Sequence, residues 1–205
     1  GLGALKGSGQ IAIEEILQER KENGPFKSLF DFTSRLDLRK VNRRVIESLI
    51  KAGAFDAIEK NRASLLASIG LAINFADQTN ANVGQNNLFE ASEEQVVELV
   101  SVESWDTQKQ LLEEKEALGF YFSGHPFTYY KKMIREFIPT KLSELTPREP
   151  PYLVAGIISD VRFKMTSRGK IAIITLDDSE GRMDMVVGSK VLNDFYEPVS
   201  YTHLT

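Results

Sequence analysis

The spacing of apolar residues changes along this chain and divides it into a helical part and a strand-forming part. Before about residue 78, apolar residues recur at helical intervals, as in Val45, Ile46, Leu49 and Ile50. From Pro150 onward β-branched and aromatic residues dominate, and turn sequences separate them into three runs. These runs predict strands over residues 152–163, 170–176 and 182–187, followed by a helix over residues 190–196. We therefore expect an α+β chain with more than one domain.

The order of these elements predicts the domains. Three hairpin-linked strands and a helix are typical of the opening of an oligonucleotide-binding (OB) barrel, which needs five strands. The sequence ends before the last two strands would fit, so we expect a truncated β-barrel OB-fold after an all-α domain. Between them lie a polar, acidic segment and a helix that starts near Trp105 and stops at Gly119. The expected divisions are an all-α domain at 1–78, a linker at 79–104, a helical connector at 105–148, the barrel at 149–198 and an unassigned tail at 199–205.

The composition restricts the compartment and the kinds of partner. The formal net charge of the 205 residues is −4, so any nucleic-acid binding must come from a local basic patch. The chain has no cysteine, which excludes disulfides and thiolate metal sites and fits a reducing cytoplasm. It shows neither a signal-peptide pattern nor the roughly 18 apolar residues that a membrane span needs. Because it also lacks an initiator Met, we expect a piece of a longer protein.

A glycine pair stands at the start of the first predicted helix, in the run Lys6, Gly7, Ser8 and Gly9. Glycine lets the backbone come close to a phosphate, and a helix N-terminus offers it unpaired N–H donors. This is how a helix-hairpin-helix module holds duplex backbone without reading bases, and Lys6 would add a positive charge. A tight turn between helices with no ligand fits the same residues.

A second candidate for phosphate contact is the basic cluster of Arg35, Arg39, Lys40, Arg43 and Arg44. On a helix that starts near residue 40, the last two arginines would lie on the side away from the core. The turn before that helix would then be a second, glycine-free hairpin of a tandem pair, and its binding would weaken steeply with salt. A solvated basic face is the alternative.

Two further motifs fit binding to partners. Gln85, Leu88 and Phe89 place an adjacent apolar pair in the polar linker, where they would either fill a pocket on a partner protein or fold back onto the helices. In the strand region, aromatic and basic side chains share the first hairpin, a mixture typical of single-strand binding. These side chains are Tyr152, Phe163, Lys164, Arg168 and Lys170. Barrel core and ordinary surface are the alternatives for them.

No set of residues predicts an active site. His125 and His203 have no metal-site or triad context, and a structural role is expected for His125. Asp177, Asp178 and Asp184 could suggest metal carboxylates, but we expect a solvated turn there. We predict no catalytic residue, metal or cofactor in this chain.

Six runs, in order and suitably spaced, resemble the bacterial DNA polymerase III alpha subunits, the C-family replicative polymerases. They are residues 1–9 (GLGALKGSG), 24–32 (GPFKSLFDF), 49–56 (LIKAGAFD), 114–126 (EKEALGFYFSGHP), 154–157 (VAGI) and 175–178 (TLDD). The resemblance extends over residues 1–195 and implies a piece from the C-terminal half of such a subunit.

The resemblance implies a function for each motif. The family's tandem helix-hairpin-helix domain grips duplex DNA, which implies this role for Lys6, Gly7, Ser8, Gly9, Arg39, Lys40, Arg43 and Arg44. The family's linker binds the β sliding clamp through a glutamine followed by a leucine–phenylalanine pair, a pattern that Gln85, Leu88 and Phe89 match. The OB domain implies single-stranded template for Phe163, Lys164, Arg168 and Lys170.

The resemblance also implies where the chemistry lies. The family's catalytic aspartates, with their Mg²⁺ and dNTPs, belong to a palm domain that would precede Gly1. The expected partners are therefore duplex DNA, the clamp, single-stranded template and the rest of the holoenzyme, in the bacterial cytoplasm and at the nucleoid during replication. A structural spacer and a nuclease are the rival functions, and the nuclease lacks a carboxylate or histidine cluster.

Overall fold

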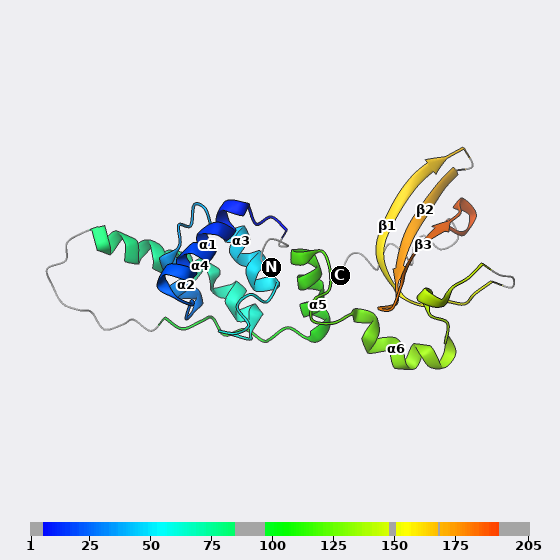
Figure 1. Cartoon of the computed structure of the whole chain (residues 1–205), viewed down its shortest axis with the longest axis horizontal. Helices are drawn as coiled ribbons and strands as arrows, with labels where there is room; N and C mark the ends of the chain where they lie inside the picture. The colour runs from blue at the N-terminus through cyan, green and yellow to red at the C-terminus, as the bar shows by residue number, and fades with distance from the viewer. Residues whose placement is uncertain (1–5, 85–96, 148–150, 168, 193–205) are drawn as a thin grey trace. The chain divides into compact units, whose positions relative to one another are not determined.

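The structure is a computed structural model of the 205-residue chain, and it divides into two units at residues 123 and 124. It describes residues 6–84, 97–147, 151–167 and 169–192, with backbone only at 82–84. The first unit is helical and the second carries the sheet (Figure 1). The predicted α+β class is thereby confirmed, and the division falls within the predicted connector.

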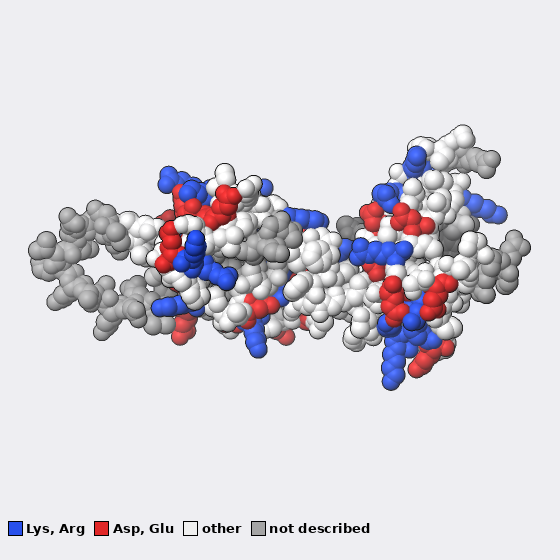
Figure 2. All heavy atoms as spheres, viewed as in Figure 1, with Lys and Arg blue, Asp and Glu red and all other residues white. Residues whose placement is uncertain are grey.

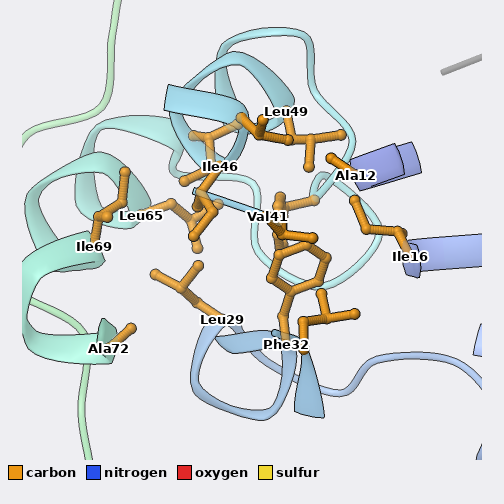
Figure 3. Packing of buried hydrophobic residues seen from close by; sticks show 14 of the residues in the cluster. Ala12, Ile16, Leu29, Phe32, Val41, Ile46, Leu49, Leu65, Ile69 and Ala72 are labelled. Carbon is orange, nitrogen blue, oxygen red and sulfur yellow. The ribbon is translucent and has the colours of Figure 1, made fainter. Parts of the chain in front are cut away.

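The first unit contains the helices α1 (Gln10–Asn23), α2 (Leu29–Arg35), α3 (Arg43–Lys51), α4 (Arg62–Gly84) and α5 (Thr107–Leu118). Their apolar faces meet in one core, where side chains from α1, α2, α3 and α4 point toward one another (Figure 3). The core includes Ala12, Ile16, Leu29, Phe32, Val41, Ile46, Leu49, Leu65, Ile69 and Ala72. The apolar residues at helical spacing over residues 45–50, which are Val45, Ile46, Leu49 and Ile50, form the buried face of α3 as predicted.

Side-chain caps explain where two of these helices begin. Ser28 accepts a hydrogen bond from the N–H of Asp31 at 3.0 Å, and Asn61 accepts one from the N–H of Ser64 at 3.1 Å. Both caps are predictable from the sequence, because Ser and Asn satisfy the unpaired N–H groups of a first turn.

The structure has ordered segments at both ends of the predicted linker of residues 79–104. Helix α4 continues to Gly84, and residues 97–103 run back along α4 without forming a helix or a strand. The N–H of Val100 donates to Ser68 Oγ at 2.8 Å, and the N–H of Val102 donates to Ser64 Oγ at 3.1 Å. These serines, four residues apart on one helix, are buried and pair with alternate N–H groups. The attachment depends on a long-range contact and has no local sequence signal.

The second unit contains α6 (Pro126–Phe137), the short 3-10 helix η2 (Leu142–Glu144), and three strands in the order β1-β2-β3, all antiparallel. The strands are β1 (Ile157–Thr166), β2 (Gly169–Asp177) and β3 (Arg182–Val187). Three strands were predicted, but the first begins and ends later than expected. A further helical turn covers residues 189–192, and the described residues form no closed barrel.

Helix α6 is absent from the sequence-based prediction. His125 caps it, because its Nδ1 accepts from the N–H of Phe127 at 3.2 Å, and Pro126 occupies the first turn. The Nε2 of His125 lies 3.1 Å from Asp177 Oδ1, so the histidine has the expected structural role. Pro126 is the sequence signal that could have predicted α6, because proline favours a first helical turn.

The expectation of a solvated turn at residues 177–178 is wrong, because both carboxylates are buried. Asp178 is fully buried and accepts from the N–H groups of Leu142 at 2.9 Å and Gly181 at 2.8 Å. Arg135 Nη2 donates to it at 2.6 Å. These partners satisfy the buried charge, and two of them, Leu142 and Arg135, are distant in the sequence, so a local pattern does not reveal the arrangement. Among the described residues no group of three or more histidines or carboxylates could hold a metal.

No helix in the described ranges is both long and apolar enough to cross a bilayer.

Asp178→Asn should lower the free energy of unfolding of the second unit by about 3 kcal/mol, as expected when one partner of a buried ion pair is removed. Urea denaturation monitored through the NMR amide signals of β2 and β3 measures the effect. Asp184→Asn is the matched control, because the Asp184 side chain is 54% exposed and its pair should contribute less than about 1 kcal/mol. Equal losses in the two variants would contradict the assigned role of Asp178.

The same carboxylate should make the second unit acid-sensitive. Burial by itself would raise the pKa of Asp178, but the Leu142 N–H and Arg135 outweigh it and hold the pKa at about 2, below the ordinary 3.8. A depressed pKa contributes stability that is complete above pH 4 and is lost as the pH falls toward 2. We expect Asp178 to contribute about 2 kcal/mol to the loss over this range, so the loss should be smaller by this amount in Asp178→Asn. Denaturation midpoints at several pH values test this, and parallel acid dependence in both proteins would contradict it.

Candidate nucleic-acid interface

Residues 6–9, here called the hairpin, lead directly into α1. Gly7 has a φ of +78°, the left-handed region that favours glycine. Gly9 is the N-cap residue of α1, and no side chain caps this helix. No atom of the described residues lies within 4 Å of the position that a Cβ on either glycine would occupy. The first N–H groups of α1 are therefore open to an anion from outside, and the partial positive charge of a helix N-terminus favours one.

A pocket of about 380 Å³ joins the hairpin to α3 and α5. Its lining residues are Lys6, Gly7, Arg44, Glu47, Ser48, Lys51, Glu116 and Ala117. Arg44 and the hairpin are separated by more than 30 residues of chain, yet they border the same pocket. The structure thus brings together members of both predicted duplex-binding groups.

The other members of the basic cluster each have an acidic partner. Arg39 pairs with Asp37 at 3.2 Å, Lys40 with Glu15 at 2.7 Å, and Arg43 with Glu47 at 2.8 Å. The hydrogen bond to Glu15 raises the pKa of Lys40. Figure 2 shows basic and acidic side chains interleaved on the visible face, with no large area of one sign. An incoming phosphate would have to compete with these carboxylates.

Arg44 and Arg35 differ from the rest of the cluster in opposite ways. Arg44 is exposed and forms no ion pair with the described residues. Arg35 is largely buried, donates to Glu19 at 2.9 Å and lies over the Phe26 ring at 4.5 Å. The bond to Glu19 raises the pKa of Arg35 despite the opposing effect of burial. Arg35 therefore holds α1 to α2, and Arg44 is the cation of this cluster that is free to bind a ligand.

The sequence analysis missed the contribution of Lys51 and of α5 to this pocket. Lys51 Nζ lies 2.7 Å from Glu113 and 3.0 Å from Glu116. Burial opposes its charge, but these two carboxylates raise the pKa of Lys51. About sixty residues separate α3 from α5, so no local pattern could have indicated that they share a site.

The other predicted sites are only partly described. Gln85, Leu88 and Phe89 lie outside the described residues, as does Arg168. Phe163 and Lys170 share one face of the sheet, with Lys170 Nζ 4.3 Å from the centre of the Phe163 ring. Lys164 pairs with Ile171, one residue out of step with Phe163, and so lies on the opposite face. Two of the four residues predicted to bind single strands are therefore brought together.

Comparison with known proteins identifies the class of the helical unit. Residues 1–65 match the family model described as a helix-hairpin-helix motif. This range contains the hairpin, α1, α2 and α3. The open α1 N-terminus beyond Gly7 agrees with this class.

Relatives named DNA polymerase III subunit alpha match nearly the whole chain. The protein of Neisseria meningitidis serogroup A is 45% identical over 195 residues, which is 94% of this chain and 17% of the relative. Those of Vibrio cholerae and Escherichia coli K12 are 40% and 36% identical, each over 96% of this chain and 18% of the relative. The chain belongs to the DNA polymerase III alpha-subunit family and spans 17 to 18% of the length of these relatives. The resemblance stated from the sequence is confirmed.

Proposed function

We propose that the chain binds the sugar–phosphate backbone of duplex DNA without sequence preference, through the hairpin and Arg44. The observation that carries this proposal is the pocket that Lys6 and Gly7 share with Arg44, next to the uncapped N-terminus of α1. Phosphate contacts of this kind position a protein on DNA but do not identify bases. The family relationship to DNA polymerases supports the same function.

Each part of the interface has a defined task in this proposal. The N–H groups beyond Gly9 donate to phosphate oxygens, and the missing side chains at Gly7 and Gly9 allow close approach. Lys6 and Ser8 add a charge and a hydroxyl group. Arg44 offers a guanidinium that can hold two phosphate oxygens at once.

The paired cations take a smaller part. Arg39, Lys40 and Arg43 must exchange a carboxylate for a phosphate, so the gain on binding is smaller for them than for Arg44. Their ion pairs are also what favours the rival function, a structural spacer that does not contact DNA. The salt dependence of duplex binding, compared between the unmodified chain and Arg44→Ala, distinguishes DNA binding from the spacer function.

Arg44→Ala should weaken duplex binding and lower the slope of log K against log salt by about one unit, because one phosphate contact is lost. Fluorescence anisotropy with a duplex of arbitrary sequence, repeated over a range of salt concentrations, measures both quantities. Arg43→Ala should have a smaller effect, since that arginine is already paired with Glu47.

Arg20→Ala is the matched control. It removes the same charge from the last turn of α1, about 16 Å along the helix axis from Gly9 at 1.5 Å per residue. An unchanged slope in Arg44→Ala, or equal changes in Arg44→Ala and Arg20→Ala, would leave the spacer function in place of DNA binding.

The longer protein to which this segment corresponds would be a replicative DNA polymerase. We assign nucleotide addition, with its Mg²⁺ and dNTPs, to parts of the relatives that this chain does not match, and tethering to the chain itself.

The motif in the linker is the ground for a second assignment, the binding of the β sliding clamp by Gln85, Leu88 and Phe89. The duplex contact and the clamp contact act on one template, so each raises the effective concentration for the other. Processivity can therefore exceed what the affinity of either contact alone suggests.

Phe89→Ala should weaken binding to a purified bacterial sliding clamp by about 2 kcal/mol or more, as truncation of an aromatic anchor does. Isothermal titration calorimetry measures the dissociation constants. Phe137→Ala is the matched control, because the Phe137 side chain is 77% exposed and lies on α6. A clamp affinity that is the same in Phe89→Ala and in the unmodified chain would refute the assignment.

For the second unit we propose the opening strands of an OB barrel that contacts single-stranded template. The stacked pair of Phe163 and Lys170 supports this function, since a ring for base stacking beside a cation is typical of such surfaces. Lys164, on the opposite face, and Arg168, outside the described residues, are assigned to the same single strand with less structural support.

A further inference from the structure

The last turn of α5 holds the hairpin in place. The N–H of Lys6 donates to the carbonyl oxygen of Ala117 at 2.8 Å, one of the carbonyl groups that a helix C-terminus leaves unpaired. A Cβ on Gly119 would lie 2.9 Å from Lys6 Cε, so the lysine side chain lies directly over the glycine. On the α3 side, Ser48 Oγ donates to the Lys6 carbonyl oxygen at 3.5 Å. The hairpin therefore begins between α3 and α5.

A buried ion pair fixes α5 in this position. Arg62, at the start of α4, is 5% exposed, and its Nη1 donates to Glu114 Oε1 at 2.9 Å. Glu114 is fully buried and also accepts from the N–H groups of Phe122 at 3.2 Å and Ser123 at 2.8 Å. The Ser123 hydroxyl donates to the same carboxylate. Glu114 thus ties α5 both to α4 and to the segment that follows α5.

Glu114 lies three residues before Ala117, less than one helical turn. A shift or rotation of α5 at Glu114 is transmitted to the Ala117 carbonyl with little loss, because a helix is stiff over this length. The ion pairs of Lys51 with Glu113 and Glu116 hold the same turn to α3, but Glu116 is 68% exposed and contributes less. The buried pair is therefore the stronger restraint on where α5 places the hairpin.

We propose that α5 is a positioning element of the duplex-binding site, and that Glu114 is the positioning residue through which it sets the hairpin. This inference rests on the proposed duplex binding and deepens it. It extends the DNA-binding unit well beyond residues 1–65, the range of the helix-hairpin-helix match, to the end of the first unit at Ser123. Glu114 itself contacts no DNA and acts only through Ala117 and Lys6.

The test is Glu114→Gln in the whole chain, read by hydrogen exchange at the Lys6 amide and by the salt dependence of duplex binding. Glutamine keeps the shape of the side chain but presents an NH₂ group to the donors that now surround the carboxylate. We expect the Lys6 amide to exchange about 10-fold faster or more, because its bond to Ala117 opens more often. We also expect the salt slope to fall by about one unit, because Lys6 no longer holds its phosphate.

Two controls separate positioning from a loss of charge or of stability. Glu103→Gln makes the same chemical change at an exposed site and should alter neither quantity. Ile69→Ala destabilises the core of the same unit, so it can lower the folded fraction and the apparent affinity, but it should leave the salt slope unchanged. A slope that falls in Glu114→Gln but not in Ile69→Ala supports positioning.

Unchanged exchange at Lys6, or an unchanged salt slope alongside faster exchange, would overturn the inference. If Glu114→Gln does not fold, Ser123→Ala removes one donor to the carboxylate and is judged by the same two readouts, with an expected rise in exchange of about 3-fold. If the unmodified chain does not bind duplex at all, the proposed function fails. The exchange at Lys6 then still decides whether Glu114 sets the hairpin.

Discussion

Arg62 is a buried cation that holds α3, α4 and α5 to one another. Its guanidinium donates to both oxygens of Asp56, to Glu114 and to the Lys51 carbonyl oxygen, so it joins the end of α3, the start of α4 and α5. Removing such a charge from water is costly, and only this complete set of acceptors offsets the cost. The side chain also needs room. Gly53 provides it, because a Cβ there would overlap Arg62 Nη2, and its φ of +80° favours glycine as well.

The buried ion pair of Arg62 and Glu114 explains why the candidate DNA site is built from three distant segments. The hairpin supplies the open helix N-terminus, α3 supplies Arg44, and α5 closes the pocket at Ala117. The overall charge of −4 makes no attractive field for DNA, so binding depends on the local geometry of a few cations. Most of those cations are already paired, and this favours weak and reversible contact. The proposed tethering function requires contact of this kind, because a tethered polymerase would have to move along its template.

The sequence alone indicates the parts of the molecule that depend on local rules. Helical spacing and the caps at Ser28 and Asn61 locate the core helices, and turn sequences locate the strands. The sequence alone does not indicate the features that depend on contacts between distant residues. The buried carboxylate of Asp178, the attachment of residues 97–103 to Ser64 and Ser68, and the docking of α5 on the hairpin are all of this kind. For the candidate site, the glycines and Arg44 were identified, but their shared pocket and the ion pairs of Arg39, Lys40 and Arg43 required the structure.

The central claim is that one surface, made by the hairpin and the first turn of α3, meets the DNA backbone. The most direct measurement is an NMR titration of the isotope-labelled chain with a short duplex, followed through its amide signals. The account predicts that the largest shifts occur at Gly7, Ser8, Gly9 and Arg44, with little change at Arg20 at the far end of α1. The same shifts should appear with duplexes of unrelated sequence. Shifts that are absent from the hairpin, or that are largest elsewhere in the helical unit, would contradict the account.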